Sequence, residues 1–107
     1  MKVLYSRQAI ADLSDIANYY TASASPAVSE AIARRLFDVI DRIQRAPLSA
    51  PRVVQRSNIR AASVVRYPFR IFYRVRGDTI DILHIRHTSR RPLTGLNEPS
   101  QPGIADR

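Results

Sequence analysis

The sequence predicts an α+β domain in which an antiparallel sheet is covered on one face by a hairpin of two helices. Three observations carry this prediction: a short strand-like stretch at the N-terminus, two segments with apolar residues at helical spacing, and three alternating runs separated by turn residues. The 107 residues are enough for one modest core. We therefore expect a single domain over residues 2–96, in the order strand, helix, helix and three strands, and a flexible Pro/Gly-rich tail over residues 97–107.

The first strand is expected over residues 2–5, and a helix should begin near Ser6, whose hydroxyl can accept a hydrogen bond from a free amide of the first turn. Apolar residues then recur at helical spacing at Ile10, Leu13, Ile16, Ala17 and Tyr20. Such a one-sided apolar face predicts that the helix packs against the sheet.

The second helix should begin at Ser25-Pro26, because serine suits the N-cap and proline suits the first helical position. Pro47 marks its end. Its apolar stripe consists of Val28, Ile32, Leu36, Val39, Ile40 and Ile43. Its outer surface should be nearly neutral, because an acid precedes an arginine by four residues in the pairs Glu30/Arg34, Asp38/Arg42 and Asp41/Arg45.

Residues 46–59 read as a loop that holds a short extended piece at Val53-Val54. Three strands are then expected over residues 60–66, 69–76 and 79–87, separated by turns at Tyr67-Pro68 and Gly77-Asp78. These strands form a meander.

Alternation along the last two strands divides their residues between the helix-covered face and the open face of the sheet. The covered side is expected to hold Ile71, Tyr73, Val75, Leu83, Ile85 and His87. The open side is expected to hold Arg70, Arg74, His84 and Arg86, interleaved with Phe72 and Ile82. The sequence therefore predicts a basic open face with apolar patches.

The net charge of +8 is concentrated in the second half of the chain. Residues 1–51 carry six basic and five acidic side chains, whereas residues 52–96 carry ten arginines against Asp78 and Asp81. Arginine suits bidentate contact with carboxylate or phosphate. We expect an acidic partner, and charge alone leaves nucleic acid and an acidic protein segment equally open.

Several classes of function are not expected. The chain has no cysteine, no apolar run that could span a membrane and no signal-peptide pattern, so we expect a cytoplasmic protein without disulfides. His84 and His87 lie three apart on a strand and face opposite sides, which disfavours a shared metal site. No cofactor is predicted.

The stretch Arg70-Ile-Phe-Tyr-Arg-Val, the Gly-Asp turn and the run from Ile80 to Pro92, with its His87-Thr-Ser-Arg90 ending, resemble the signature end of the RelE/ParE toxin superfamily. The opening strand and helical hairpin fit as well, so the resemblance covers residues 2–96. It implies the toxin of a type II toxin–antitoxin pair, held in a hetero-oligomer by an acidic, partly disordered antitoxin that folds on the open face.

Members of the superfamily differ in target. RelE-like members cut mRNA on the ribosome, whereas ParE-like members block DNA gyrase without cleavage. Arg70, His87 and Arg90 match family positions and would be the catalytic candidates in a nuclease, with His84 or His87 as base. The single lysine and the balanced second helix favour the ParE-like branch. Whether the chain is an enzyme stays open.

The resemblance and the charge pattern together predict a surface that binds antitoxin or target, composed of Arg70, Phe72, Arg74, His84, Arg86, Arg90 and Arg91. Structural alternatives exist for each residue: His87 could be a strand-end residue bonded to a neighbouring loop, and the arginines a solvated face. A harmless RNA-binding module is the rival from another class, and Phe72 is its only candidate for base stacking.

Overall fold

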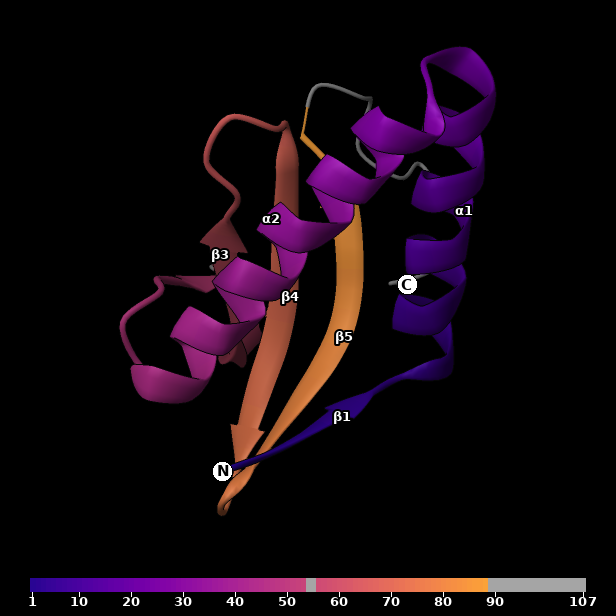
Figure 1. The fold of residues 1–107 in the computed structure, drawn as a ribbon. Coiled ribbons are helices and arrows are strands. Elements are labelled where there is room, and N and C mark those ends of the chain that lie inside the picture. The colour runs from indigo at the N-terminus through magenta and orange to yellow at the C-terminus, as the bar shows by residue number, and fades with distance from the viewer. Residues whose placement is uncertain (54–55, 89–107) are drawn as a thin grey trace.

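A computed structural model describes residues 1–53 and 56–88, which form five strands and two helices (Figure 1). The elements are β1 (Lys2–Tyr5), α1 (Arg7–Ser23), α2 (Pro26–Arg45), β2 (Arg52–Val53), β3 (Arg56–Ser63), β4 (Phe69–Arg76) and β5 (Thr79–His87). The predicted α+β class, with a helical hairpin against one face of the sheet, is confirmed. The predicted tail, residues 97–107, lies outside the described residues.

The sheet has the order β1-β5-β4-β3-β2 and is mixed. Strands β2 to β5 pair antiparallel, as expected for a meander, but β1 runs parallel to β5, from Lys2 beside Thr79 to Tyr5 beside Ile82. The sequence did not reveal this direction, because two helices separate β1 from the rest of the sheet and no tight turn fixes its orientation.

The strand boundaries differ from the prediction mainly around β3. This strand begins at Arg56 and ends at Ser63, rather than spanning 60–66. Arg66 has a positive φ of 80°, which belongs to a turn and ends any extended run before it. The expected extended piece near residue 53 is β2, and Val54 lies outside the described residues.

Both predicted helix starts are confirmed. The Ser6 hydroxyl accepts a hydrogen bond from the Ala9 N–H at 2.9 Å and donates one to the Leu83 carbonyl at 2.8 Å, so it caps α1 and fastens it to β5. Ser25 accepts from the Val28 N–H at 3.1 Å in front of Pro26. Each cap depends only on residues within three positions of it, so both helix starts could be predicted from the sequence.

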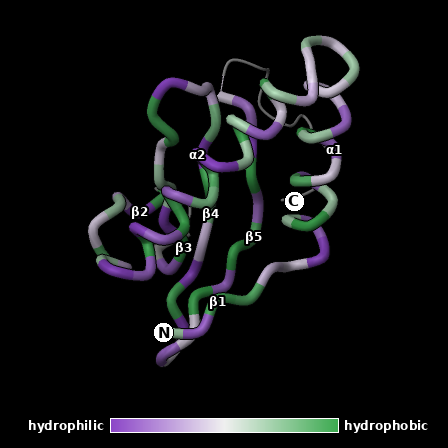
Figure 2. Tube along the Cα trace, in the orientation of Figure 1, coloured by the Kyte–Doolittle hydropathy of each residue, from purple (hydrophilic) through white to green (hydrophobic). Residues whose placement is uncertain are grey.

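The core lies between the helical hairpin and the sheet, and α2 supplies most of its helical side (Figure 1). Hydrophobic and hydrophilic residues alternate along β4 and β5 (Figure 2). The fully buried large side chains are Tyr73, Ile32, Leu36, Ile71, Ile80 and Ile82. Ile10 and Val28, at the starts of the two predicted stripes, are exposed.

A β-bulge interrupts the pairing of β4 with β5. Phe72 is opposite His84 and Tyr73 is opposite Ile82, which leaves Leu83 as an extra residue. The bulge shifts the alternation by one, so Ile82 and Ile85 both face the core. The expectation that Ile82 lies on the open face is therefore wrong, since unbroken alternation does not hold across a bulge.

Candidate functional site

The face of the sheet turned away from the helices, here called the open face, is rich in arginine. In β4 the residues Phe69, Ile71 and Tyr73 are buried under the helices, so the alternate positions lie on the open face. Their cross-strand partners in β5 share this face. The open face thus includes Arg70, Phe72, Arg74, Arg76, Asp81 and Arg86. His84, opposite Phe72, shares this face, so five residues of the predicted surface are brought together: Arg70, Phe72, Arg74, His84 and Arg86.

Asp81 binds two of these arginines at once. Arg76 donates from Nε to Oδ2 at 2.9 Å and from Nη2 to Oδ1 at 3.1 Å, and Arg74 donates from Nη2 to Oδ2 at 3.1 Å. The side chain of Asp81 is only 10% exposed. The hydrogen bond from Arg76 and, secondarily, that from Arg74 hold the pKa of Asp81 below its ordinary value against the opposing effect of burial.

This cluster was missed by reasoning from the sequence. In the sequence, Asp81 is only one of two acidic residues among ten arginines. Its position opposite Arg74 depends on the register of the strand pairing. Aligning the last two predicted strands across their hairpin could have suggested the ion pair between Asp81 and Arg74, because opposite charges directly across an antiparallel strand pair attract. Arg74 and Arg76 therefore carry less free positive charge than the sequence indicates.

Arg70 lies in a different environment on the same face. Its guanidinium is 5.2 Å from the centre of the Phe72 ring, a cation–π contact, and the residue is exposed. Within the described part of the chain, no carboxylate forms an ion pair with it. Arg86 is directly opposite on β5, so two like charges are neighbours. The exposed guanidinium of Arg70 could bind an anionic ligand.

His84 is held at the edge of the sheet by α1. Its Nδ1 is 3.5 Å from Asp12 Oδ2, and the same oxygen accepts a hydrogen bond from the Ile85 N–H at 2.9 Å. Gln8 donates to the other Asp12 oxygen at 2.8 Å. Asp12 thus bonds the backbone of β5 beyond the end of β1, and His84 is half-buried beside it.

His87 lies on the helix-covered side, opposite Phe69. The two rings are 5.2 Å apart at 80°, and Phe69 in turn contacts the Tyr20 ring at 6.2 Å. His87 and Arg70 therefore project from opposite faces of the sheet. The candidates Arg90 and Arg91 lie outside the described residues.

The described residues contain no group of three or more His, Cys, Asp or Glu side chains suited to a metal ion. No helix in this part of the chain is both long and apolar enough to cross a membrane.

Known proteins of similar sequence and structure point to one family. The family model described as the ParE toxin of type II toxin–antitoxin systems matches residues 3–92. A solved structure described as the chromosomal ParDE system from P. aeruginosa is 26% identical, with a TM-score of 0.75 over 83% of this chain and 97% of that one. No curated protein sequence matches.

A second solved structure, described as a YoeB/ParE toxin from Agrobacterium tumefaciens, has a TM-score of 0.59 over 81% of this chain and 98% of that one. At 15% identity it supports the fold alone. The family match covers most of the chain, including both helices and the arginine-bearing strands β4 and β5. The chain therefore belongs to the ParE toxin family of type II toxin–antitoxin systems.

Proposed function

We propose that the protein inhibits growth by poisoning DNA gyrase and that an acidic antitoxin neutralises it by covering the open face. Membership of the ParE toxin family, together with arginines gathered on one uncovered face, is the observation that carries this proposal. Arg70, which is exposed on this face and forms no ion pair among the described residues, supplies the physical reason for an acidic partner.

Inhibition by binding is favoured over RNA cleavage by the positions of the possible proton-transfer groups. A nuclease needs a general base within reach of the arginines that neutralise the phosphate. His87 contacts Phe69 on the opposite face, and Asp81 already accepts from Arg74 and Arg76. His84 is on the open face opposite Phe72, but its Nδ1 is 3.5 Å from the Asp12 carboxylate at the sheet edge. Ribosome-dependent mRNA cleavage, the RelE-like alternative, is kept as an outcome of the test.

The first experiment asks whether the protein is a toxin and what restrains it. The chain is expressed in a bacterial host alone and together with the product of each short reading frame next to its gene. Growth arrest that one acidic product relieves is the expected result. A chain that is harmless without any partner would contradict the proposal.

The second experiment identifies the target with purified components. Supercoiling by purified gyrase should be inhibited by the protein, while mRNA on purified ribosomes should stay intact. His87→Ala should leave inhibition of gyrase unchanged, because this ring packs on the covered side. Arg70→Gln tests the open face, and Arg34→Gln on the exposed surface of α2 is its matched control. Cleavage of ribosome-bound mRNA that His87→Ala abolishes would instead establish the nuclease.

A further inference from the structure

An aromatic side chain, Phe72, lies among the arginines of the open face. It is half-buried, and it is not part of the core that the helices and the sheet enclose among the described residues. Its cross-strand neighbours are Ala61 on β3, which has only a methyl side chain, and His84 on β5. The ring therefore belongs to the open face, and part of it is accessible to solvent.

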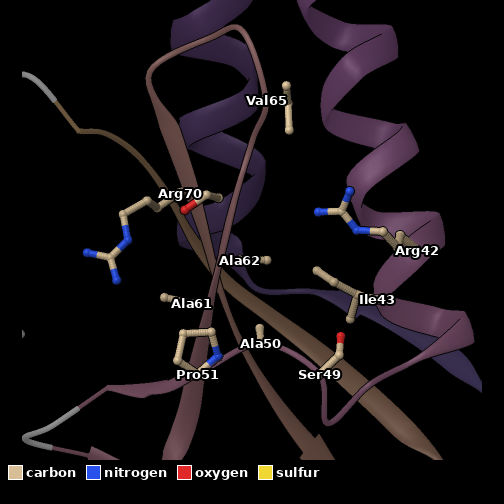
Figure 3. A pocket seen from close by; sticks show the side chains of 10 residues that line it. Arg42, Ile43, Ser49, Ala50, Pro51, Ala61, Ala62, Val65 and Arg70 are labelled. Carbon is tan, nitrogen blue, oxygen red and sulfur yellow. The ribbon is translucent and has the colours of Figure 1, made fainter.

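The Arg70 guanidinium lies over this ring, 5.2 Å from its centre. Arg70 and Arg42 both border a hollow at the edge of β3, and Figure 3 shows them on opposite sides of that strand, with Arg70 turned away from α2. Arg70 is exposed and forms no ion pair with a carboxylate among residues 1–53 and 56–88. A flat cation beside an aromatic ring is a surface on which another flat group can stack.

Positive side chains flank the ring along β4. Arg70 and Arg74 are each two residues from Phe72, which places their backbones about 7 Å to either side of it. Arg74 and Arg76 share one carboxylate, that of Asp81, so this pair keeps a net positive charge. A ring between two cationic positions matches a strand of nucleic acid, in which each internal base lies between two phosphates.

We propose that Arg70, Phe72 and Arg74 bind single-stranded DNA, with one base stacked on the Arg70–Phe72 pair and the neighbouring phosphates held by the two arginines. The choice of DNA rests on the proposed function, since gyrase cuts and rejoins the strands of DNA. A single strand fits this site because the bases of a duplex are stacked on one another and offer no free face to the ring.

An acidic peptide is a poorer match for this particular site. Its carboxylates would bind the arginines but gain nothing from the Phe72 ring, whereas every nucleobase has a flat face that stacks on an aromatic group. The site lies on the face that the antitoxin is proposed to cover. The antitoxin should therefore release bound DNA from the protein.

The test measures binding of short oligonucleotides to the full chain by fluorescence anisotropy, at about 50 mM salt. The first probe is an oligothymidylate of about eight nucleotides, within the range of known single-strand sites. The second is a strand of the same length with the same phosphates but without bases. Oligothymidylate should bind about tenfold more tightly, because only this probe can stack on the ring. Equal affinity of the two probes would overturn the proposal.

Two pairs of variants separate stacking from charge. Phe72→Leu should weaken binding of oligothymidylate about tenfold and leave binding of the strand without bases within about twofold of the wild type. Phe37→Leu is the matched control, because this ring is 48% exposed on α2, away from the sheet. Arg70→Gln should weaken both probes, whereas Arg34→Gln on α2 should change neither by more than about twofold.

Circular dichroism checks that the four variants are folded. Equal effects of Phe72→Leu and Phe37→Leu would overturn the stacking site. The assignment to DNA is tested by comparing oligodeoxyuridylate with oligouridylate of the same length. Similar affinity, or tighter binding of the deoxy strand, is expected, because no contact to the sugar is proposed. A preference of about tenfold or more for the ribose strand would overturn the assignment to DNA.

Failure of this inference differs from failure of the proposed function, because the binding assay contains neither gyrase nor cells. If the protein inhibits gyrase but binds the two probes equally, the proposed function stands and the stacking site is wrong. If oligothymidylate binds through Phe72 but gyrase is not inhibited, the DNA site stands and the proposed target is wrong.

Discussion

Replacing Asp81 with asparagine should lower the stability of the protein and at the same time raise its affinity for polyanions. The carboxylate accepts hydrogen bonds from Arg74 and Arg76 through both of its oxygens. The asparagine side chain would offer one neutral oxygen in its place, so the two guanidiniums would lose their shared counter-charge.

The size of the effect follows from the exposure of the partners. The Asp81 side chain is 10% exposed, but those of Arg74 and Arg76 are 39% and 59% exposed. Exposed ion pairs contribute up to about 1 kcal/mol, and breaking a buried one costs about 3–5 kcal/mol. We therefore expect Asp81→Asn to lower the free energy of unfolding by about 2 kcal/mol at neutral pH, and the melting temperature by about 10 °C.

The pH dependence has a defined sign. Because the hydrogen bonds lower the pKa of Asp81 in the folded protein, its stabilising effect is fully present above the ordinary carboxyl pKa, about 3.9, and is lost as the pH falls through the folded value. The difference in unfolding free energy between the wild type and Asp81→Asn should thus shrink as the pH falls below about 4.

Urea denaturation between pH 3 and pH 7 measures the difference in unfolding free energy between wild type and Asp81→Asn. The salt concentration needed to elute each protein from a cation exchanger measures the change in surface charge. Asp78→Asn, in the exposed hairpin turn, removes the same charge without breaking a described ion pair, so its unfolding free energy should stay within about 0.5 kcal/mol of the wild type. Equal stability of the two variants at pH 7, or a gap between wild type and Asp81→Asn that is as large at pH 3 as at pH 7, would refute the reasoning.

Three further changes test how the site is supported, each by urea denaturation. Tyr73→Phe removes a buried hydroxyl that donates to the Pro47 carbonyl at 2.7 Å and should cost about 1 kcal/mol; no loss would mean that this bond does not hold the loop. Ser6→Ala removes the α1 cap and the bond to Leu83, at a cost of about 1.5 kcal/mol, and Ser6→Thr should recover most of it. Gly77→Ala forces a side chain into a φ of 63° and should cost about 1 kcal/mol, although nothing crowds the position; an unchanged midpoint would show that the turn shifts freely.

The parts of the fold that depend on nearby residues were predictable from the sequence. The helix starts at Ser6 and Ser25 follow from side chains that bond amides three residues on, and the hairpin at Gly77-Asp78 follows from backbone preference. Each of these signals is contained within a few residues, so no knowledge of the tertiary structure is needed.

The features that depend on register could not be predicted in the same way. The parallel pairing of β1 and the bulge at Leu83 are set by how distant segments pack, and the bulge moves Ile82 from the expected open face into the core. The pairing of Asp81 with Arg74 also depends on the strand register, so the sequence did not identify these two residues as partners. The arginine-rich face was predicted, but how its charge is distributed was not.

The position of β1 beside β5 also constrains how the protein is made. Lys2 pairs with Thr79, so β1 must wait until β5 has been synthesised before this edge of the sheet can close. Ser6 likewise needs the Leu83 carbonyl, which is synthesised 77 residues later. Closure of this edge of the sheet is therefore a late step of folding, because it joins segments that are almost eighty residues apart in the chain.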